Sequence, residues 1–426
     1  MDKFIIEGPT PLQGEIPISG SKNAALPLMA AALLSETPTR ISNIPRLNDI
    51  YTFNNVLRVT GARVDFEEDD HALVIDPRHL SHLEAPYDLV RKMRASFYML
   101  GALLGRFGEA RVSLPGGCAW GPRPVNLHLE GLKALGAEIE IDAGYVVAKA
   151  ESGRLKGGSF TLSPSSVGAT VNIVLAAVLA KETSVIKNAA REPDVVILCE
   201  SLNKMGAKIS GVGTNKLTIE GVEKLNGAEL TNIPDRIEAG TFLIAGLMHP
   251  DSRLTITGAD ATHLGTFPET INQLHPHMET GDDFITIAPP DKLLASSVKT
   301  QIYPGFPTDL QAQWATLMTQ AEGSSFITDT IYPDRFSYIP ELNRLGANMQ
   351  IKKNTAQVTG PTTLEGASVM STDLRASVSL VMAGMIAHGK TEVLRVYHLD
   401  RGYENLEDKL NRAGAKIKRS QAETSY

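Results

Sequence analysis

The sequence predicts an α/β protein built from six repeated units that divide into two domains of three. A leucine, two or three further residues, Gly-Ala and then alternating polar and apolar residues recur about every 70 residues. An apolar helix rich in Ala, Leu, Met and Gly recurs with the same period. The chain has 426 residues, more than one ordinary core organises, which favours two or three domains.

The first recurring element is an amphipathic helix that ends at a glycine and leads into a strand. The glycines of its five clear copies are Gly61, Gly136, Gly206, Gly346 and Gly414. The interval before Gly346 is two periods long, so we expect a sixth copy near residues 274–278. Gly-Ala is lost there, but an alternating strand pattern follows at 283–287.

The second recurring element carries almost no charge after its first turn. A helix without a polar face has to be buried on all sides. Each unit is therefore expected to hold one inner helix, shielded by strands and by an amphipathic outer helix. The six inner helices are predicted at 21–34, 94–104, 168–180, 236–248, 309–321 and 373–387.

Polar and charged residues gather at the N-terminal ends of the inner helices. Capping explains the Ser, Thr and Asp residues there. It does not explain the four cations, because a positive charge at a helix N-terminus opposes the helix dipole. These cations are Lys22, Arg94, Arg236 and Arg375. We infer that an anionic ligand supplies their counter-charge, with solvated charge as the alternative.

The two cysteines lie in contrasting surroundings. Cys118 falls in a segment, 115–124, with three glycines and three prolines, which is the composition of a loop. If the Cys118 thiol is exposed, the positive charge of nearby Arg123 would favour its thiolate and make it reactive. An inert, buried Cys118 is an equally favoured alternative. Cys199 lies in an apolar helical pattern and is expected in the core. Such a pair predicts no disulfide framework and fits the reducing cytoplasm.

Composition excludes several classes of function. The net charge of −7 argues against a general nucleic-acid or membrane-surface binder. The longest apolar run, 24–34, is shorter than the ~20 residues that span a bilayer. The N-terminal segment lacks a signal-peptide pattern. We find no zinc-ligand spacing, no P-loop and no strand followed by G-x-G-x-x-G.

Short motifs recur along the whole chain, at 19–27, 93–96, the Cys118 loop, 166–170, 234–238, 306–309, 372–376 and 400–404. Together they resemble the motifs of the enolpyruvyl transferase family, and within it the UDP-N-acetylglucosamine 1-carboxyvinyltransferases. They occur in the family's order and without large gaps.

The resemblance implies a two-domain inside-out α/β barrel of six βαβαββ repeats, three per domain, with buried inner helices. The family's first strand crosses to the C-terminal domain, which implies domains of 22–233 and of 1–21 with 234–426. The implied reaction transfers the enolpyruvyl group of phosphoenolpyruvate to the 3-hydroxyl of UDP-N-acetylglucosamine by addition and elimination, releasing phosphate. This is the first committed step of peptidoglycan synthesis in the cytoplasm. It needs no metal or organic cofactor, and fosfomycin inhibits it.

The resemblance also implies roles for individual residues. Cys118 matches the family's proton donor, Asp309 matches the carboxylate that faces the sugar hydroxyl, and Lys22 matches a third catalytic residue. The phosphoenolpyruvate positions are Lys22, Asn23, Arg94, Arg123, Arg375 and Arg401. The UDP-N-acetylglucosamine positions are Asn23, Arg94, Arg123, Pro124, Val125, Asn126, Leu127, Ser166, Val167, Gly168, Asp309 and Ile331.

Three positions depart from the family pattern. Asn48 and Pro164 stand where lysine is common, and Asn126 stands where aspartate is common. These departures concern contacts to the uridine diphosphate rather than the reaction class.

Two alternative functions stay open. The sister enzyme that makes 5-enolpyruvylshikimate 3-phosphate shares the fold, but its doubled-lysine N-terminal signature is absent here. A noncatalytic sugar-nucleotide sensor could use the same scaffold, since a fold does not dictate a function. Retention of the proton donor, the carboxylate and the clamp cations argues against a sensor.

Overall fold

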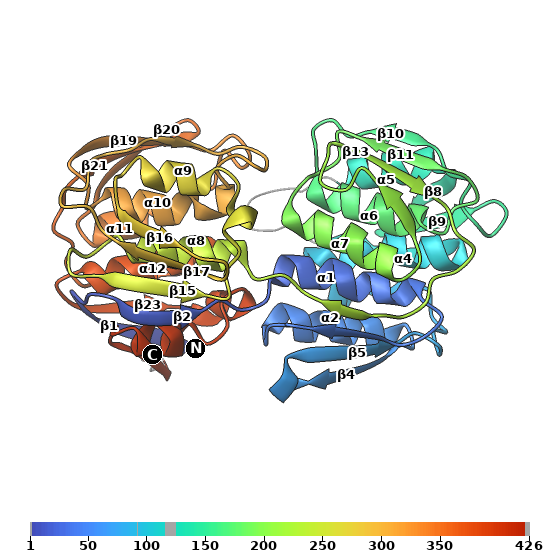
Figure 1. The fold of residues 1–426 in the computed structure, drawn as a ribbon, viewed down its shortest axis with the longest axis horizontal. Helices are drawn as coiled ribbons and strands as arrows, with labels where there is room; N and C mark the ends of the chain where they lie inside the picture. The colour runs from blue at the N-terminus through green and yellow to red at the C-terminus, as the bar shows by residue number, and fades with distance from the viewer. Residues whose placement is uncertain (1, 92, 116–124, 422–426) are drawn as a thin grey trace. The chain divides into compact units, whose positions relative to one another are not determined.

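The computed structural model describes residues 2–91, 93–115 and 125–421, and the chain forms two compact units (Figure 1). The central unit comprises Gly20–Ile233, and the terminal unit joins Met1–Ser19 to Pro234–Tyr426. Each unit has its own core of buried apolar side chains. In the described part of the chain, no helix combines the length and apolar character that crossing a membrane requires.

Three four-stranded sheets cover the central unit. In each sheet the first two strands are parallel and the other pairings are antiparallel. In spatial order the strands are β14 (Glu229–Thr231), β3 (Thr39–Ser42), β5 (Ala72–Asp76) and β4 (Arg63–Glu67); β6 (Glu84–Ala85), β7 (Glu109–Ser113), β9 (Tyr145–Ala150) and β8 (Ala137–Asp142); and β10 (Ser159–Thr161), β11 (Ser184–Lys187), β13 (Lys216–Glu220) and β12 (Lys208–Ser210).

The terminal unit has three sheets of the same design. Their strands, in spatial order, are β2 (Gln13–Pro17), β15 (Arg253–Thr257), β17 (Phe284–Ala288) and β16 (His277–Thr280); β18 (Val298–Lys299), β19 (Gly323–Thr328), β21 (Thr355–Gly360) and β20 (Asn348–Lys352); and β22 (Ser368–Met370), β23 (Gly389–Leu394), β1 (Asp2–Gly8) and β24 (Ile417–Gln421). The N-terminal strands, blue among yellow and red in Figure 1, complete two of these sheets. β1 pairs antiparallel with β23 and β24, and β2 pairs parallel with β15.

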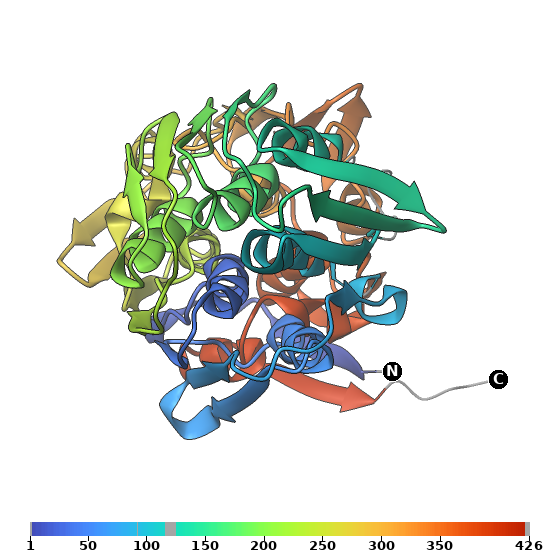
Figure 2. The ribbon, with the colours of Figure 1, turned by 90° about the vertical axis from the view of Figure 1, so that its right-hand side faces the viewer.

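The six predicted inner helices are present. They are α1 (Lys22–Ala31) with η1 (Ala32–Leu34), η3 (Arg94–Phe97) with α4 (Tyr98–Phe107), α6 (Val167–Ala177), α8 (Arg236–Ala245), η5 (Thr308–Leu310) with α10 (Gln311–Met318), and α12 (Leu374–Ile386). All eight residues of α10 are buried. In Figure 2, helices of the central unit lie inside and strands lie outside. This arrangement confirms the predicted inside-out α/β fold with buried inner helices.

Close packing of these helices explains their small residues. A Cβ atom added at Gly101 in α4 would lie 2.3 Å from the backbone oxygen of Asn172 in α6. A real Cβ cannot approach that closely, so only glycine fits there.

The amphipathic outer helices also match the predicted repeat. They are α2 (Asn48–Val59), α5 (Asn126–Ala134), α7 (Pro193–Lys204), α9 (Phe267–Asn272), α11 (Ile339–Arg344) and α13 (Leu406–Arg412). The remaining short helices are η2 (Glu68–Asp70), α3 (Tyr87–Val90), η4 (Ala261–Leu264) and η6 (Val396–Arg401).

The repeat glycines end these outer helices in a left-handed conformation. The φ angle is 98° at Gly61 and 110° at Gly206. In the sixth copy, where Gly-Ala is lost, His275 takes this role with a φ of 55°. The expected sixth unit therefore exists, and a histidine tolerates the left-handed turn that the other copies assign to glycine.

Candidate functional site

The central feature of the terminal unit is a carboxylate held by two guanidinium groups. Asp309 lies in η5, at the start of an inner helix. Its Oδ1 atom is 2.7 Å from Nη1 of Arg335, and its Oδ2 atom is 3.6 Å from Nη2 of Arg375. The Asp309 side chain is 29% exposed, whereas those of Arg335 and Arg375 are only 11% and 7% exposed.

This arrangement keeps Asp309 ionised. Burial by itself would raise the pKa of the carboxyl, but the positive charges of Arg335 and then Arg375 outweigh burial and bring the pKa well below its usual value. For Arg375, burial opposes the charge, while Tyr403 and Asp309 favour it, and the net effect raises its pKa. Asp309 is therefore a carboxylate, which can accept a hydrogen bond or a proton.

The structure brings Ile331 close to the turn that carries Asp309. The Oδ1 atom of Asp329 accepts hydrogen bonds from the backbone N–H groups of Ile331 (2.9 Å) and Tyr332 (2.8 Å). The Oδ2 atom of Asp329 accepts one from the Thr308 hydroxyl at 2.6 Å. Asp329 thus ties the loop after β19 to η5. Sequence reasoning missed both Asp329 and Arg335, because neither lies at the start of an inner helix.

A phenol contacts Arg375 and lies close in sequence to Arg401, another predicted cation of the terminal unit. Nη1 of Arg375 donates a hydrogen bond to the Tyr403 oxygen at 3.0 Å, and that oxygen lies 2.9 Å from the Thr241 hydroxyl. Arg401 is the last residue of η6, two positions before Tyr403. Tyr403 was missed as a site residue, although it belongs to the 400–404 motif.

In the central unit, Lys22 has a partner within the protein. Its Nζ atom is 2.9 Å from Oδ2 of Asp49 in the first turn of α2, and the two side chains are 12% and 7% exposed. Asn23, the next residue of α1, is exposed. Asn48, which departs from the family pattern, is the first residue of α2 and directly precedes Asp49.

These pairs correct one inference from the sequence. We expected the cations at the inner-helix starts to lack counter-charges in the protein, yet Asp49 faces Lys22 and Asp309 faces Arg375. The argument for an anionic ligand from missing counter-charge is therefore wrong for these two residues. Asp49 lies on a different helix from Lys22, and no local pattern reveals that the fold joins them.

The capping explanation is confirmed for four inner helices. Side chains of Ser21, Ser166, Asp235 and Asp373 accept hydrogen bonds from backbone N–H groups in the first turns of α1, α6, α8 and α12. Asp309 is different, because its carboxylate faces arginines and caps no helix.

A buried histidine contacts elements that carry several of the predicted nucleotide-binding residues of the central unit. His128 follows Asn126 and Leu127 at the start of α5. Its ring lies 5.3 Å from that of Phe97, which ends the η3 helix that Arg94 begins. The Nδ2 atom of Asn172 is 2.9 Å from Nδ1 of His128. A Cβ at Gly168 would lie 3.1 Å from the His128 ring.

His128, itself in α5, therefore contacts residues of η3 and α6, and the first turns of these three elements carry Arg94, Asn126, Leu127, Val167 and Gly168. Burial, and then the charge of Arg94, lower the pKa of His128 to about 3, so its ring is neutral. Val125 and Ser166 are the N-caps of α5 and α6. Exposed Pro164 lies two residues before Ser166. Sequence reasoning missed His128, although it directly follows the predicted Leu127.

Three predicted residues, Cys118, Arg123 and Pro124, lie outside the described residues. Cys199 is fully buried in α7, as predicted, and burial raises the pKa of its thiol to about 12. It is not a reactive thiolate at neutral pH.

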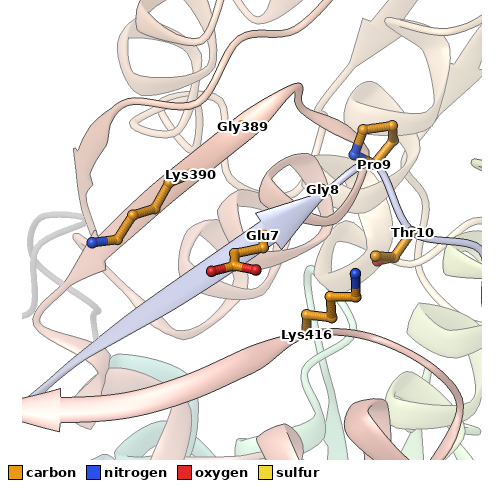
Figure 3. A pocket seen from close by; sticks show the side chains of 7 residues that line it. All are labelled: Glu7, Gly8, Pro9, Thr10, Gly389, Lys390 and Lys416. Atoms are coloured by element: carbon orange, nitrogen blue, oxygen red, sulfur yellow. The ribbon is translucent and has the colours of Figure 1, made fainter.

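A pocket in the terminal unit lies away from these groups. It is lined by Glu7, Gly8, Pro9, Thr10, Gly389, Lys390 and Lys416. Figure 3 shows the amino groups of Lys390 and Lys416 on opposite sides of Glu7, so they do not converge on one point. Among the predicted site residues that the structure describes, none lines this pocket.

Comparison with known proteins gives the family. Residues 6–410 match the family model described as EPSP synthase (3-phosphoshikimate 1-carboxyvinyltransferase). A UDP-N-acetylglucosamine 1-carboxyvinyltransferase from Chloroherpeton thalassium is 54% identical over 420 residues, which cover 98% of this chain and 97% of that protein. The protein of the same name from Proteus mirabilis is 49% identical, with 98% and 99% covered.

Solved structures agree on the fold. The enolpyruvyl transferase NikO from Streptomyces tendae matches with a TM-score of 0.91 and 27% identity, over 99% of each chain. EPSP synthase from Acinetobacter baumannii matches with a TM-score of 0.76 and 18% identity, over 99% of this chain and 100% of that one. These findings confirm the predicted resemblance, and the chain belongs to the EPSP synthase family of enolpyruvyl transferases.

Proposed function

We propose that this protein transfers the enolpyruvyl group of phosphoenolpyruvate to the 3-hydroxyl of UDP-N-acetylglucosamine and releases phosphate. The observation that carries the proposal is the 54% identity, over nearly the whole chain, to a relative named for this reaction. The reaction starts peptidoglycan synthesis, and we assign it to the cytoplasm. The substrates are small molecules, and the proposal includes no metal or organic cofactor.

Asp309 is the proposed base for the sugar hydroxyl. Addition of that hydroxyl to phosphoenolpyruvate requires loss of its proton as the carbon–oxygen bond forms. Asp309 is ionised and sufficiently exposed to accept this proton. Arg335 and Arg375 fix its orientation and also weaken its basicity. Asp309 is therefore a weak base. We expect it to take the proton only as the new carbon–oxygen bond forms, because bond formation makes the hydroxyl more acidic.

Cations surround the phosphate and carboxylate of phosphoenolpyruvate in this proposal. Such groups stabilise the charge that develops as phosphate leaves. The proposed residues are Lys22, Asn23, Arg94, Arg123, Arg375 and Arg401. Cys118 is the proposed donor of the proton to the methylene carbon. In the elimination step that carbon loses a proton while the neighbouring carbon's bond to the phosphate oxygen breaks, which re-forms the double bond and releases phosphate.

The nucleotide sugar is assigned to helix starts. Backbone N–H groups at an inner-helix N-terminus suit the diphosphate, and the grouping of η3, α5 and α6 around His128 supports this assignment. The proposed contacts are Asn23, Arg94, Arg123, Pro124, Val125, Asn126, Leu127, Ser166, Val167, Gly168, Asp309 and Ile331.

Phosphate release from phosphoenolpyruvate tests the function directly. We expect release with UDP-N-acetylglucosamine and none above background with shikimate 3-phosphate. Release only with shikimate 3-phosphate would favour the sister activity. Binding of the sugar nucleotide without release under either condition would favour a sensor.

Fosfomycin, a small anionic epoxide, is expected to label Cys118 and not Cys199. The cations proposed to bind phosphoenolpyruvate would bind the phosphonate and place the epoxide carbon near the Cys118 sulfur. Reactants positioned in this way react faster than the same groups free in solution. Cys199 is fully buried and its thiol pKa is raised to about 12. Peptide mass spectrometry would locate the adduct. Cys118→Asp should resist labelling, while modification at Cys199 alone would refute the assignment.

A further inference from the structure

A buried ionic network includes Glu404, which follows the turn that carries Arg401. Lys409 in α13 places its Nζ atom 2.6 Å from Oε1 of Glu238 and 2.7 Å from the Ser19 hydroxyl oxygen. The backbone N–H of Ser19 donates to Oε2 of Glu238 at 2.7 Å, and the Ser19 hydroxyl donates to Oε2 of Glu404 at 2.7 Å. The Lys409 and Glu238 side chains are 11% and 2% exposed, and Glu404 is also buried.

Ser19 is the junction of this network. Its hydroxyl accepts from Lys409 and donates to Glu404, while its backbone N–H donates to Glu238. Its carbonyl also accepts a hydrogen bond from the backbone N–H of Asp235 at 2.8 Å. One residue of the N-terminal segment therefore connects the first turn of α8, helix α13 and the residue that follows Tyr403.

Glu404 directly follows the Arg401–Tyr403 turn, which is hydrogen-bonded back to Leu399. The backbone N–H groups of Gly402 and Tyr403 both donate to the Leu399 carbonyl, at 3.0 and 2.9 Å. Gly402 packs so tightly on α12 that an added Cβ would lie 2.5 Å from Leu374. Fixing Glu404 therefore constrains the direction of the Arg401–Tyr403 turn.

The other end of the turn is held separately. Arg419 in β24 makes two hydrogen bonds to Asp400, at 2.6 and 3.0 Å. Asp400 directly precedes Arg401, so the segment is anchored on both sides.

Stability alone is a weak reason for burying such charges. A buried ion pair loses hydration that its attraction only partly offsets, and well-packed apolar residues often stabilise as much. What charged partners add is a defined geometry. Here that geometry reaches Arg401 and, through Tyr403, Arg375.

We propose that Ser19, together with Lys409 and Glu404, is a positioning residue for the anion-binding group Arg401–Tyr403–Arg375. This inference rests on the proposed function. In this proposal Ser19 makes no contact with substrate but orients the turn whose arginine is assigned to the phosphate or carboxylate of phosphoenolpyruvate.

The test compares Ser19→Ala with wild type in the full chain. Ser19→Ala removes the hydroxyl's hydrogen bonds to Glu404 and from Lys409 but leaves the Lys409–Glu238 ion pair. We expect the KM for phosphoenolpyruvate to rise about tenfold or more, since a hydrogen bond to a charged group contributes about 1.5–3 kcal/mol. The KM for UDP-N-acetylglucosamine should change by less than about twofold, and Ser19→Thr should restore the wild-type values.

Ser252→Ala is the matched control. Ser252 is a buried serine of the same unit, and its hydroxyl oxygen accepts a hydrogen bond from the backbone N–H of Leu12 at 2.9 Å. It holds the same N-terminal segment, so its loss should lower the melting temperature without changing the KM for phosphoenolpyruvate.

Three outcomes would overturn the proposal: an unchanged KM in Ser19→Ala, an equal rise for both substrates, or the same effect in Ser252→Ala. If Ser19→Ala does not fold, Glu404→Gln and Glu404→Leu decide. Only glutamine retains an oxygen that can accept the Ser19 hydrogen bond, so only leucine should raise the KM. If the wild-type protein releases no phosphate when phosphoenolpyruvate and UDP-N-acetylglucosamine are both present, the proposed function itself is refuted.

Discussion

Asp309→Asn is expected to reduce turnover by about 10²–10⁴-fold, the range for loss of a general base. Asparagine matches aspartate in shape, but its amide cannot accept a proton from the sugar hydroxyl. It also leaves Arg335 and Arg375 without the carboxylate that both face. The effect should fall on kcat, measured as phosphate release at saturating concentrations of both substrates.

Asp260→Asn is the control for this prediction. Asp260 also lies in the terminal unit and caps η4 by accepting a hydrogen bond from the backbone N–H of Thr262 at 2.9 Å. Its amide variant keeps an oxygen in that place and should stay close to wild-type turnover. Near-normal kcat in Asp309→Asn would show that another group takes the proton.

Lys22→Ala should damage both activity and stability. Loss of a charge-assisted contact to phosphate is expected to lower kcat/KM for phosphoenolpyruvate by roughly 100-fold. The same change leaves Asp49 without its cation, and its side chain is only 7% exposed. Breaking a buried ion pair costs about 3 kcal/mol, so the free energy of unfolding should fall by up to that amount.

The double variant Lys22→Ala/Asp49→Asn separates the two effects. Removing both charges should restore most of the stability, because no buried carboxylate is left unpaired. It should not restore activity, since the cation is still missing. Denaturant unfolding and phosphate release would be measured on the same preparations. Recovery of activity in the double variant would show that Lys22 serves only to neutralise Asp49.

Local patterns were sufficient to predict most of the fold. The recurring Gly-Ala helices and the uncharged inner helices reveal a period of about 70 residues, because periodicity and burial leave direct marks in composition. The same marks place Cys199 in the core and Ser21, Ser166, Asp235 and Asp373 at helix N-caps. The left-handed φ of His275 could not be predicted in this way, because the sequence has no glycine at that position.

The partners of the charged residues depend on the tertiary structure. Asp49 beside Lys22, Arg335 beside Asp309 and Tyr403 beside Arg375 join different elements, and the Ser19 network joins the two ends of the chain. Hydrophobic periodicity reports which side of an element is buried, whereas an ion pair depends on which elements the fold places together. The residue types and helix starts of the candidate site could therefore be predicted from sequence, but its electrostatics follow from contacts that only the folded chain creates.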